Sequence, residues 1–260
     1  MRKATERQGR LDCPAVVNVK LNLACRDEII PILMALQHVY ERPELRDEIL
    51  RAVAADVNGR SSRKRGRQGM DYWSIVVLAA VRLGCNLNYD KLQDLAEQHR
   101  ALRQVMGIGD WEESTPFDWR RIRDNITLIR PQTLERINHL IVGEGHRLVP
   151  EAVQTARADS FVMGTNIHYP TESSLIRDGL RKVLECGGAL AELLGIESAI
   201  NALQSGNGLE RCRDRTEVGF SRYIQLGALG RNLHVLGKIL LAREDAGCQA
   251  AQSRRNRAAA

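Results

Sequence analysis

An aspartate at the junction of a short strand and a polar loop is the residue of this chain best placed to hold a metal ion. Asp159 lies within residues 153–163, whose composition is compatible with a strand, and residues 164–171 have the composition of a loop. An acidic side chain at such a junction can reach a divalent cation. A solvated aspartate at a strand end fits the same pattern, so both interpretations stay open. Because the chain is also rich in arginine, the combination indicates metal-dependent chemistry on a polyanion.

The positive charge of the chain is gathered in clusters. The 260 residues carry 38 Lys and Arg against 32 Asp and Glu, a formal net charge of +6. Arginine and lysine gain affinity for nucleic acid by releasing condensed counterions, so several clusters along one chain favour a phosphate-binding surface over unrelated solvated patches. A cluster near the C-terminus contains Arg254, Arg255 and Arg257. The other clusters supply the candidate DNA-binding residues Arg63, Lys64, Arg65, Arg67, Arg120, Arg121, Arg123, Arg211, Arg213 and Arg215.

Apolar residues at helical spacing predict a mostly α protein. The expected helices cover about residues 28–40, 43–53, 71–83, 88–95, 117–129, 131–148, 190–203 and 219–242. Asn88 is expected to cap one of them, and Pro131 to open another. Trp111 and Trp119 are expected in the core, because each stands beside a polar turn that needs an apolar anchor.

The composition divides the chain into five stretches. An N-terminal helical segment over residues 1–59 precedes a basic linker over residues 60–69 and a compact helical domain over residues 70–149. Residues 150–246 combine the strand with several helices. Residues 247–260 form a basic tail that we expect to be disordered.

The cysteines and the apolar segments exclude several classes of protein. The six cysteines form no CxxC pair and have no histidine at ligand spacing, so we expect free thiols and no zinc site. The charged N-terminus has no apolar region of a secretory signal after it. The longest strongly apolar stretch is far too short to span a bilayer. We therefore expect a cytoplasmic protein with no membrane partner.

Several segments resemble the bacterial insertion-sequence transposases of the DDE type. In that family the first metal-binding Asp is followed by the sequence found here as Thr165-Asn166-Ile167-His168-Tyr169-Pro170-Thr171. Residues 114–126 (STPFDWRRIRDNI) and 131–138 (PQTLERIN) are similar to the family's N-terminal helical domain. Residues 208–215 (GLERCRDR) and 230–237 (GRNLHVLG) are similar to its closing segment. The resemblance covers most of the chain from about Asp71 onward.

The resemblance implies a helical N-terminal DNA-binding module followed by an RNase H-like α/β catalytic domain that cleaves and joins DNA with paired Mg²⁺ or Mn²⁺ ions. By resemblance, Asp159 matches the first metal-binding acid and Glu197 the third, although an exposed helical glutamate is the alternative for Glu197. The family's second Asp lies on a strand between them. Asp178, the sole Asp in that interval, sits in a helical pattern and receives no such role. We therefore expect residues 150–246 to be a truncated RNase H-like remnant with few strands, left by an internal deletion.

The implied partners are DNA, both the terminal inverted repeats of the element and the target DNA, and a second copy of this chain or a full-length transposase. The leading interpretation is a transposase polypeptide in which the second metal-binding acid is missing. The alternative is a non-catalytic DNA-binding protein that regulates transposition in competition with the full-length enzyme. The resemblance places either one in the bacterial cytoplasm, at the nucleoid. His168 lies in the matching loop but is not assigned to catalysis, because loop histidines more often bind backbone groups.

Overall fold

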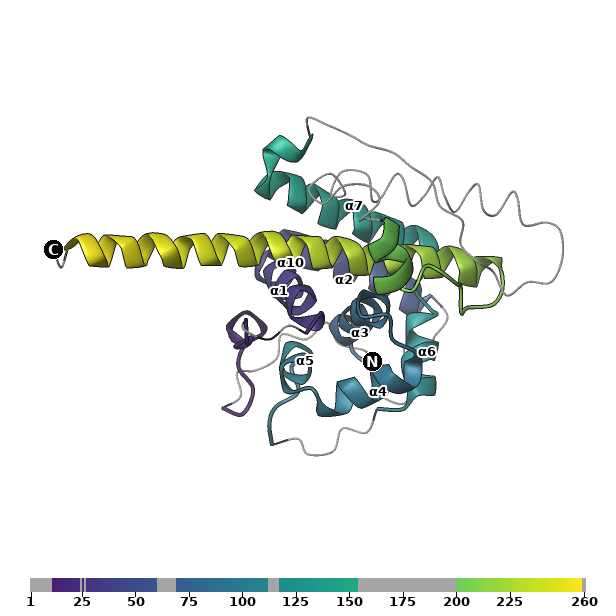
Figure 1. Ribbon diagram of the computed structural model, residues 1–260. Coiled ribbons are helices and arrows are strands. Elements are labelled where there is room, and N and C mark those ends of the chain that lie inside the picture. Colours follow the sequence, from purple (N-terminus) through teal and green to yellow (C-terminus); the bar gives the residue numbers. More distant parts are fainter. Residues whose placement is uncertain are drawn as a thin grey trace.

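The computed structural model of the chain (Figure 1) describes residues 11–23, 25, 27–59, 69–111, 117–153 and 200–258, with residues 152–153 and 247–258 described by their backbone alone. These residues form helices, turns and loops, and they contain no sheet. The mostly α prediction is therefore confirmed. The predicted strand starts at Val153, which here ends a 3-10 turn, and its other residues lie outside the described ranges.

The helices before residue 150 include every one predicted there from periodicity, together with an unpredicted one over Arg100–Val105, whereas the helix predicted over 190–203 lies mostly outside the described residues. The part before residue 154 contains η1 (Val16–Asn18), α1 (Ile29–Glu41), α2 (Pro43–Asn58), α3 (Tyr72–Gly84), α4 (Tyr89–Gln98), α5 (Arg100–Val105), α6 (Trp119–Ile126), α7 (Pro131–Leu148) and η2 (Pro150–Val153). The part after residue 199 contains the π-helical turn η4 (Ala202–Gly206) and the long helix α10 (Glu217–Ala258). Among these described helices, none has a stretch long and apolar enough to cross a bilayer.

Several helices begin where the sequence supplies a capping residue. The Asp71 side chain accepts a hydrogen bond from the backbone N–H of Ser74 at 2.8 Å, and Asn88 accepts one from that of Lys91 at 2.8 Å. Each bond satisfies an amide that the first turn of a helix leaves without a partner. Pro131 opens α7, where its missing N–H costs nothing. These local signals explain why the starts of α3, α4 and α7 match the predicted ones.

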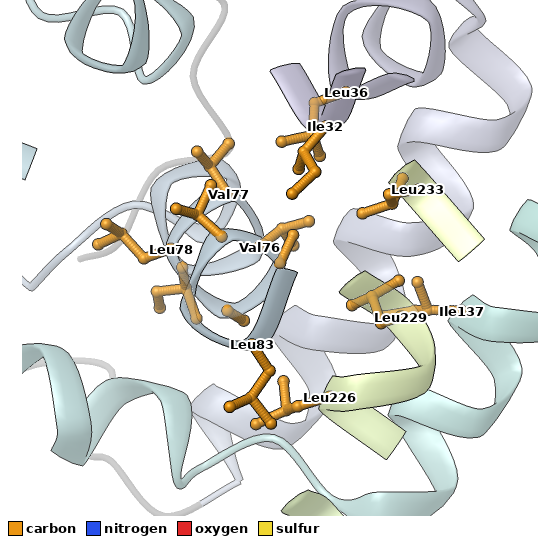
Figure 2. Close-up of a cluster of buried hydrophobic side chains, with 14 of the residues drawn as sticks. Ile32, Leu36, Val76, Val77, Leu78, Leu83, Ile137, Leu226, Leu229 and Leu233 are labelled. Carbon is orange, nitrogen blue, oxygen red and sulfur yellow. The ribbon is translucent and has the colours of Figure 1, made fainter. Parts of the chain in front are cut away.

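The longest helix, α10, closes the molecule by packing against α1, α3 and α7 (Figure 1). Figure 2 shows Leu229 and Leu233 of α10 among apolar side chains of the other helices, with Leu229 beside Ile137 of α7 and Leu226 beside Leu83 of α3. All five side chains are nearly fully buried and belong to one core. The segments that we expected in separate domains, before residue 60, from 70 to 149 and after 200, therefore share a single hydrophobic core.

Glycines let α10 approach the backbones of its neighbours. A Cβ atom added to Gly230 would lie 2.5 Å from the Cα of Gly84 on α3. A Cβ atom added to Gly237 would overlap the carbonyl oxygen of Pro31 on α1. Both crossings are therefore backbone to backbone, and larger residues would force the helices apart.

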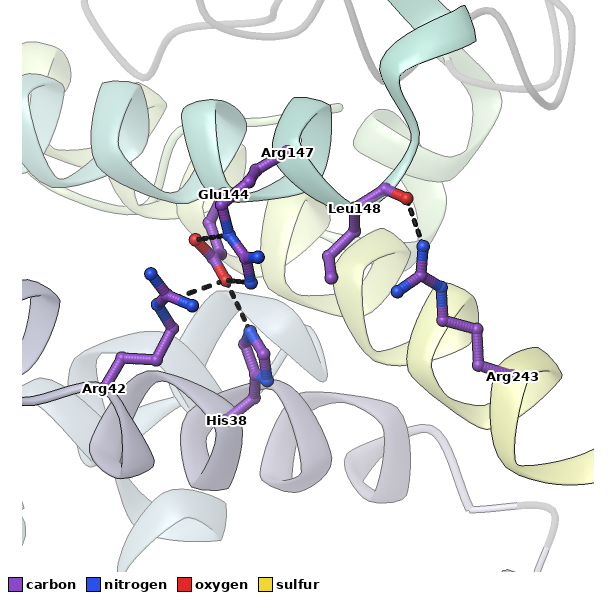
Figure 3. A network of polar contacts seen from close by, with 6 residues as sticks. All are labelled: His38, Arg42, Glu144, Arg147, Leu148 and Arg243. Atoms are coloured by element: carbon purple, nitrogen blue, oxygen red, sulfur yellow. Dashed lines mark hydrogen bonds and ion pairs between the residues drawn. The ribbon is translucent and has the colours of Figure 1, made fainter. Parts of the chain in front are cut away.

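Polar contacts fix α7 against α1. The Glu144 side chain is 7% exposed, and its carboxylate lies 2.6 Å from Nε2 of His38 and accepts a 2.7 Å hydrogen bond from Arg147, with Arg42 at 3.4 Å (Figure 3). Burial alone would raise the pKa of Glu144, but the hydrogen bonds from Arg147 and His38 and the charges of Arg147 and Arg42 hold it below its ordinary value. A buried carboxylate with three basic neighbours thus stays ionised.

Further contacts hold both ends of α7. At its start, the backbone N–H and the side chain of Arg130 donate to the carboxylate of Asp56 on α2, at 2.8 and 2.6 Å. At its end, Arg243 of α10 donates to the carbonyl oxygen of Leu148 (Figure 3). α7 is therefore anchored to α2 at one end and to α10 at the other.

Two predictions about local environment were wrong. Trp111 is 73% exposed instead of buried, and Trp119 is half-buried. The tryptophan that serves the core is Trp73, which is 6% exposed and donates its Nε1–H to the carbonyl oxygen of Val105 at 2.9 Å. A polar turn next to a tryptophan therefore did not indicate burial, whereas the continuous apolar pattern around Trp73 did.

The C-terminal stretch, expected as a disordered tail after residue 247, is part of α10. The helix continues to Ala258 and projects beyond the other helices (Figure 1). Residues 248–258 lack Gly and Pro and are rich in Ala, Gln and Arg, all good helix formers. A helix already nucleated in the core extends through such residues at little cost.

The crossing at Gly237 gives a prediction with a matched control. We expect Gly237→Ala to lower the free energy of unfolding by about 1–3 kcal/mol, because the added methyl group meets the Pro31 carbonyl. Gly143 of α7 has no atom within 4 Å of an added Cβ, so Gly143→Ala should be neutral or stabilise by up to about 1 kcal/mol through helix propensity. Urea unfolding monitored by circular dichroism measures both. Equal stabilities of the two variants would contradict the close crossing.

Candidate nucleic-acid interface

The predicted site residues divide into those that the structure describes and those that it does not. Asp159, Glu197 and His168 lie outside the described residues. So do the four basic residues of the linker, Arg63, Lys64, Arg65 and Arg67. The described candidates are the α6 cluster, Arg120, Arg121 and Arg123, and the loop cluster, Arg211, Arg213 and Arg215, in the segment before α10.

The α6 cluster surrounds a tryptophan at the start of its helix. Asp118 caps α6 by accepting a hydrogen bond from the backbone N–H of Arg120 at 2.8 Å. The guanidinium carbons of Arg120 and Arg123 lie 5.0 and 5.3 Å from the ring centroid of Trp119, within the range of cation–π contacts. Arg123 also pairs with Asp124 at 2.9 Å, whereas Arg120 and Arg121 are exposed. The first turn of α6 therefore presents arginines arranged around one aromatic ring.

A buried arginine lies next to this cluster, at the end of α3. The Arg82 side chain is 3% exposed, and its guanidinium contacts the carboxylate of Asp214 at 2.7 Å. The same guanidinium lies 4.1 Å from the ring centroid of Tyr89 and 5.5 Å from that of Tyr223. Burial alone would lower the pKa of Arg82, but Tyr89, the hydrogen bond and charge of Asp214, and Tyr223 together hold it above its ordinary value. Arg82 is thus a fixed positive charge under the surface.

Hydrogen bonds clamp the loop before α10 onto the turn between α3 and α4. Asn207 donates its Nδ2–H to the carbonyl oxygen of Leu83 at 3.0 Å, and the Tyr223 hydroxyl donates to that of Gly208 at 2.9 Å. Arg213 donates to Oδ1 of Asn86 at 2.5 Å. Gly208 has a φ of 71°, and a Cβ atom there would overlap the Asn86 side chain, so glycine is required. The loop arginines are therefore held on a rigid support.

These contacts bring the α6 cluster and the loop cluster to the same end of the molecule, where α6 and the start of α10 lie in Figure 1. The charge of Arg123 acts on Tyr89, and the charge of Arg213 acts on Tyr223. Arg82 contacts both rings and so lies between the two clusters. We call this alternation of cations and rings the arginine–aromatic surface. It comprises the buried Arg82 of α3 and Tyr223 of α10, together with Tyr89 of α4, Trp119 and the arginines of the α6 cluster, and the arginines of the loop cluster.

Burial keeps the tyrosine hydroxyls of this surface neutral. Desolvation raises the pKa of Tyr89 to about 12, even though the positive charge of Arg82 opposes the shift. The Tyr89 hydroxyl is buried and has no hydrogen-bond partner within the described parts of the chain. The rings therefore serve as faces for the guanidinium groups, and the exposed arginines remain the groups that a ligand can contact. Basic residues interleaved with aromatic rings are typical of nucleic-acid binding surfaces.

Sequence reasoning missed Arg82, Tyr89, Asp214 and Tyr223. A signal for Arg82 was present, since it is the sole charged residue of the apolar helix over Tyr72–Gly84, and such an arginine requires a partner. The partner itself gave no signal, because Asp214 lies 132 residues farther along the chain. Arg222 was also missed, and it donates to the carbonyl oxygen of Ile129 at 2.9 Å while its charge reaches Tyr89.

Neither the described residues nor comparison with known proteins identifies a metal site or a family for this chain. Within the described ranges, no group of three or more His, Cys, Asp or Glu side chains is arranged to hold a metal ion. Binding of Mg²⁺ or Mn²⁺ by Asp159 and Glu197 therefore stays a prediction. No family model, no curated protein and no solved structure matches the chain.

Removal of the charge that neutralises Arg82 should destabilise the protein. We expect Asp214→Asn to lower the free energy of unfolding by about 3–5 kcal/mol, because it leaves a buried guanidinium without a counter-charge. The control is Asp124→Asn, which removes an equivalent ion pair at an exposed position and should cost less than about 1 kcal/mol. Chemical unfolding of both variants measures the difference. If Asp214→Asn lowers the free energy of unfolding no more than Asp124→Asn does, buried Arg82 does not depend on Asp214 as its counter-charge.

Proposed function

We propose that this chain is a DNA-binding polypeptide of the insertion-element transposase lineage, which docks on DNA through the arginine–aromatic surface. The observation that carries the proposal is the geometry at the end of α3. Arg82 contacts the rings of Tyr89 and Tyr223, two arginines of the α6 cluster frame Trp119, and Arg213 of the loop cluster is held on Asn86. The resemblance of residues 158–171, and of the segments in α6, α7 and α10, supplies the lineage. The proposed DNA is the terminal inverted repeat of the element, together with target DNA.

The electrostatics of the surface support phosphate binding. Arg120, Arg121, Arg213 and Arg215 are exposed, and the carboxylates of Asp124 and Asp214 are paired with Arg123 and Arg82. Exposed guanidinium groups on a rigid support neutralise phosphates and release counterions, which provides affinity independent of base sequence. Such contacts fix the position of a protein on DNA, and sequence preference requires additional contacts with base edges.

The proposal extends to catalysis by resemblance alone. Asp159 and Glu197 would hold Mg²⁺ or Mn²⁺ in an RNase H-like α/β remnant over residues 150–246, and the ions would supply metal-dependent cleavage and strand transfer of DNA. The family's second metal-binding Asp has no counterpart in this sequence. The described structure contributes no group to this part of the proposal.

One feature of the fold favours the alternative function, a non-catalytic DNA-binding regulator of transposition. The closing segment of the chain forms α10, which packs against α1, α3 and α7. The helix at the C-terminal end thus packs on α3, which carries Arg82 of the arginine–aromatic surface. A polypeptide of this kind could occupy element ends or pair with full-length transposase at the bacterial nucleoid without cleaving DNA.

DNA binding is tested by fluorescence anisotropy with a labelled duplex of the element end at several salt concentrations. We expect affinity to fall steeply with salt. Combined Arg120→Ala, Arg121→Ala, Arg213→Ala and Arg215→Ala should weaken binding at least about tenfold and reduce the salt slope by about 0.9 for each lost phosphate contact. Arg51→Ala with Arg136→Ala is the control, since both arginines are exposed on α2 and α7. Equal loss in both variants, or no binding by the unchanged protein, would rule out this surface.

Catalysis is tested separately by Mg²⁺- or Mn²⁺-dependent nicking of the element end. The transposase proposal expects nicking that Asp159→Asn and Glu197→Gln abolish, because both variants remove a metal-binding carboxylate while leaving DNA binding unchanged. The regulator alternative expects salt-dependent binding and no nicking by any of the three proteins. Equal nicking by the unchanged protein and by Asp159→Asn would remove that residue from the mechanism.

A further inference from the structure

Trp119 is only partly buried, unlike its neighbours in the core. Its neighbours Phe117 and Ile122 are buried in the core, whereas the Trp119 side chain at the start of α6 is half-buried. Its backbone N–H donates to Oε1 of Gln93 on α4 at 2.9 Å, which fixes the first turn of α6 against α4. The backbone that carries the ring is therefore held against α4, and the residue is partly exposed to solvent.

Two arginines frame this ring. Arg120 and Arg123 place their guanidinium carbons 5.0 and 5.3 Å from its centroid. A cation–π contact at a partly exposed site is weak, so an incoming planar group can displace a guanidinium or lie between it and the ring. Arginine guanidinium groups also stack on nucleobases and bind the adjacent phosphates. The arrangement thus offers an aromatic face for a base and cations for the backbone beside it.

We propose that Trp119 is a stacking platform for an unpaired nucleobase of single-stranded DNA, with the exposed Arg120 binding a flanking phosphate. This inference rests on the proposed DNA-binding function and deepens it. In a duplex each interior base is already stacked on both faces, so an aromatic side chain stacks well only on a base that has left the helix. The same surface would bind duplex DNA through phosphates alone, with Trp119 contributing little.

The fluorescence of Trp119 tests the proposal directly. Trp73 is buried and Trp111 is exposed, so Trp111→Phe leaves Trp119 as the sole tryptophan outside the core. In this variant we expect a twelve-nucleotide oligothymidine to quench the emission, and a duplex of the same length to quench it less. Stacking also predicts that Trp119→Ala weakens oligothymidine binding about 5- to 150-fold, and duplex binding less than about threefold. Trp119→Phe should retain most of the affinity, and Trp111→Ala should bind like the unchanged protein.

The outcomes separate this inference from the proposed function. Salt-dependent duplex binding with no quenching by oligothymidine, and with no loss in Trp119→Ala, would overturn the stacking role and leave the DNA-binding proposal intact. Absence of binding to either DNA would overturn both. Because quenching is measured on the natural Trp119, the test does not depend on how Trp119→Ala folds.

Discussion

The buried charge of Arg82 is the constraint on which the arrangement of the candidate interface depends. A guanidinium that is 3% exposed is stable only with a carboxylate beside it, and Asp214 supplies one from the loop before α10. This requirement brings a segment 132 residues away onto the end of α3. The rings of Tyr89 and Tyr223 flank the same guanidinium, so the loop, α4 and α10 are positioned by a single ion pair and its stacking partners.

Close packing of α10 provides the second constraint. Gly230 and Gly237 allow backbone contact with α3 and α1, and the leucines of α10 complete the core with α3 and α7 (Figure 2). The described helices before residue 154 and α10 thereby form one helical body. A chain that lost part of its middle would keep the contacts that hold this body together. The fold therefore accommodates both proposed functions, a transposase and a regulator derived from one.

Local signals in the sequence predicted local structure well. Asn88 and Pro131 marked helix starts because a cap or a proline acts within one turn of the chain. Features set by distant contacts were not predictable in this way. The Arg82–Asp214 pair joins residues with no sequence relationship, and the sharing of one core by three supposed domains follows from packing of α10.

In the candidate site, too, local sequence signals identified some residues, whereas contacts between distant residues could not be predicted. Arg120 and Arg123 were found because basic residues cluster visibly in the sequence, but the contact of Arg82 with Tyr89 and Tyr223 depends on the tertiary fold. Trp119 was assigned to the core because it stands beside a polar turn that needs an apolar anchor, and the structure leaves it half-buried beside two arginines.

Hydrogen–deuterium exchange of the full chain, with and without a duplex of the element end, tests the central claim most directly. If the arginine–aromatic surface binds DNA, exchange should slow together in the first turn of α6 and in residues 211–216. The outer face of α7 should be unaffected. Protection confined to other helices, with α6 and the loop exchanging as in the free protein, would contradict the account.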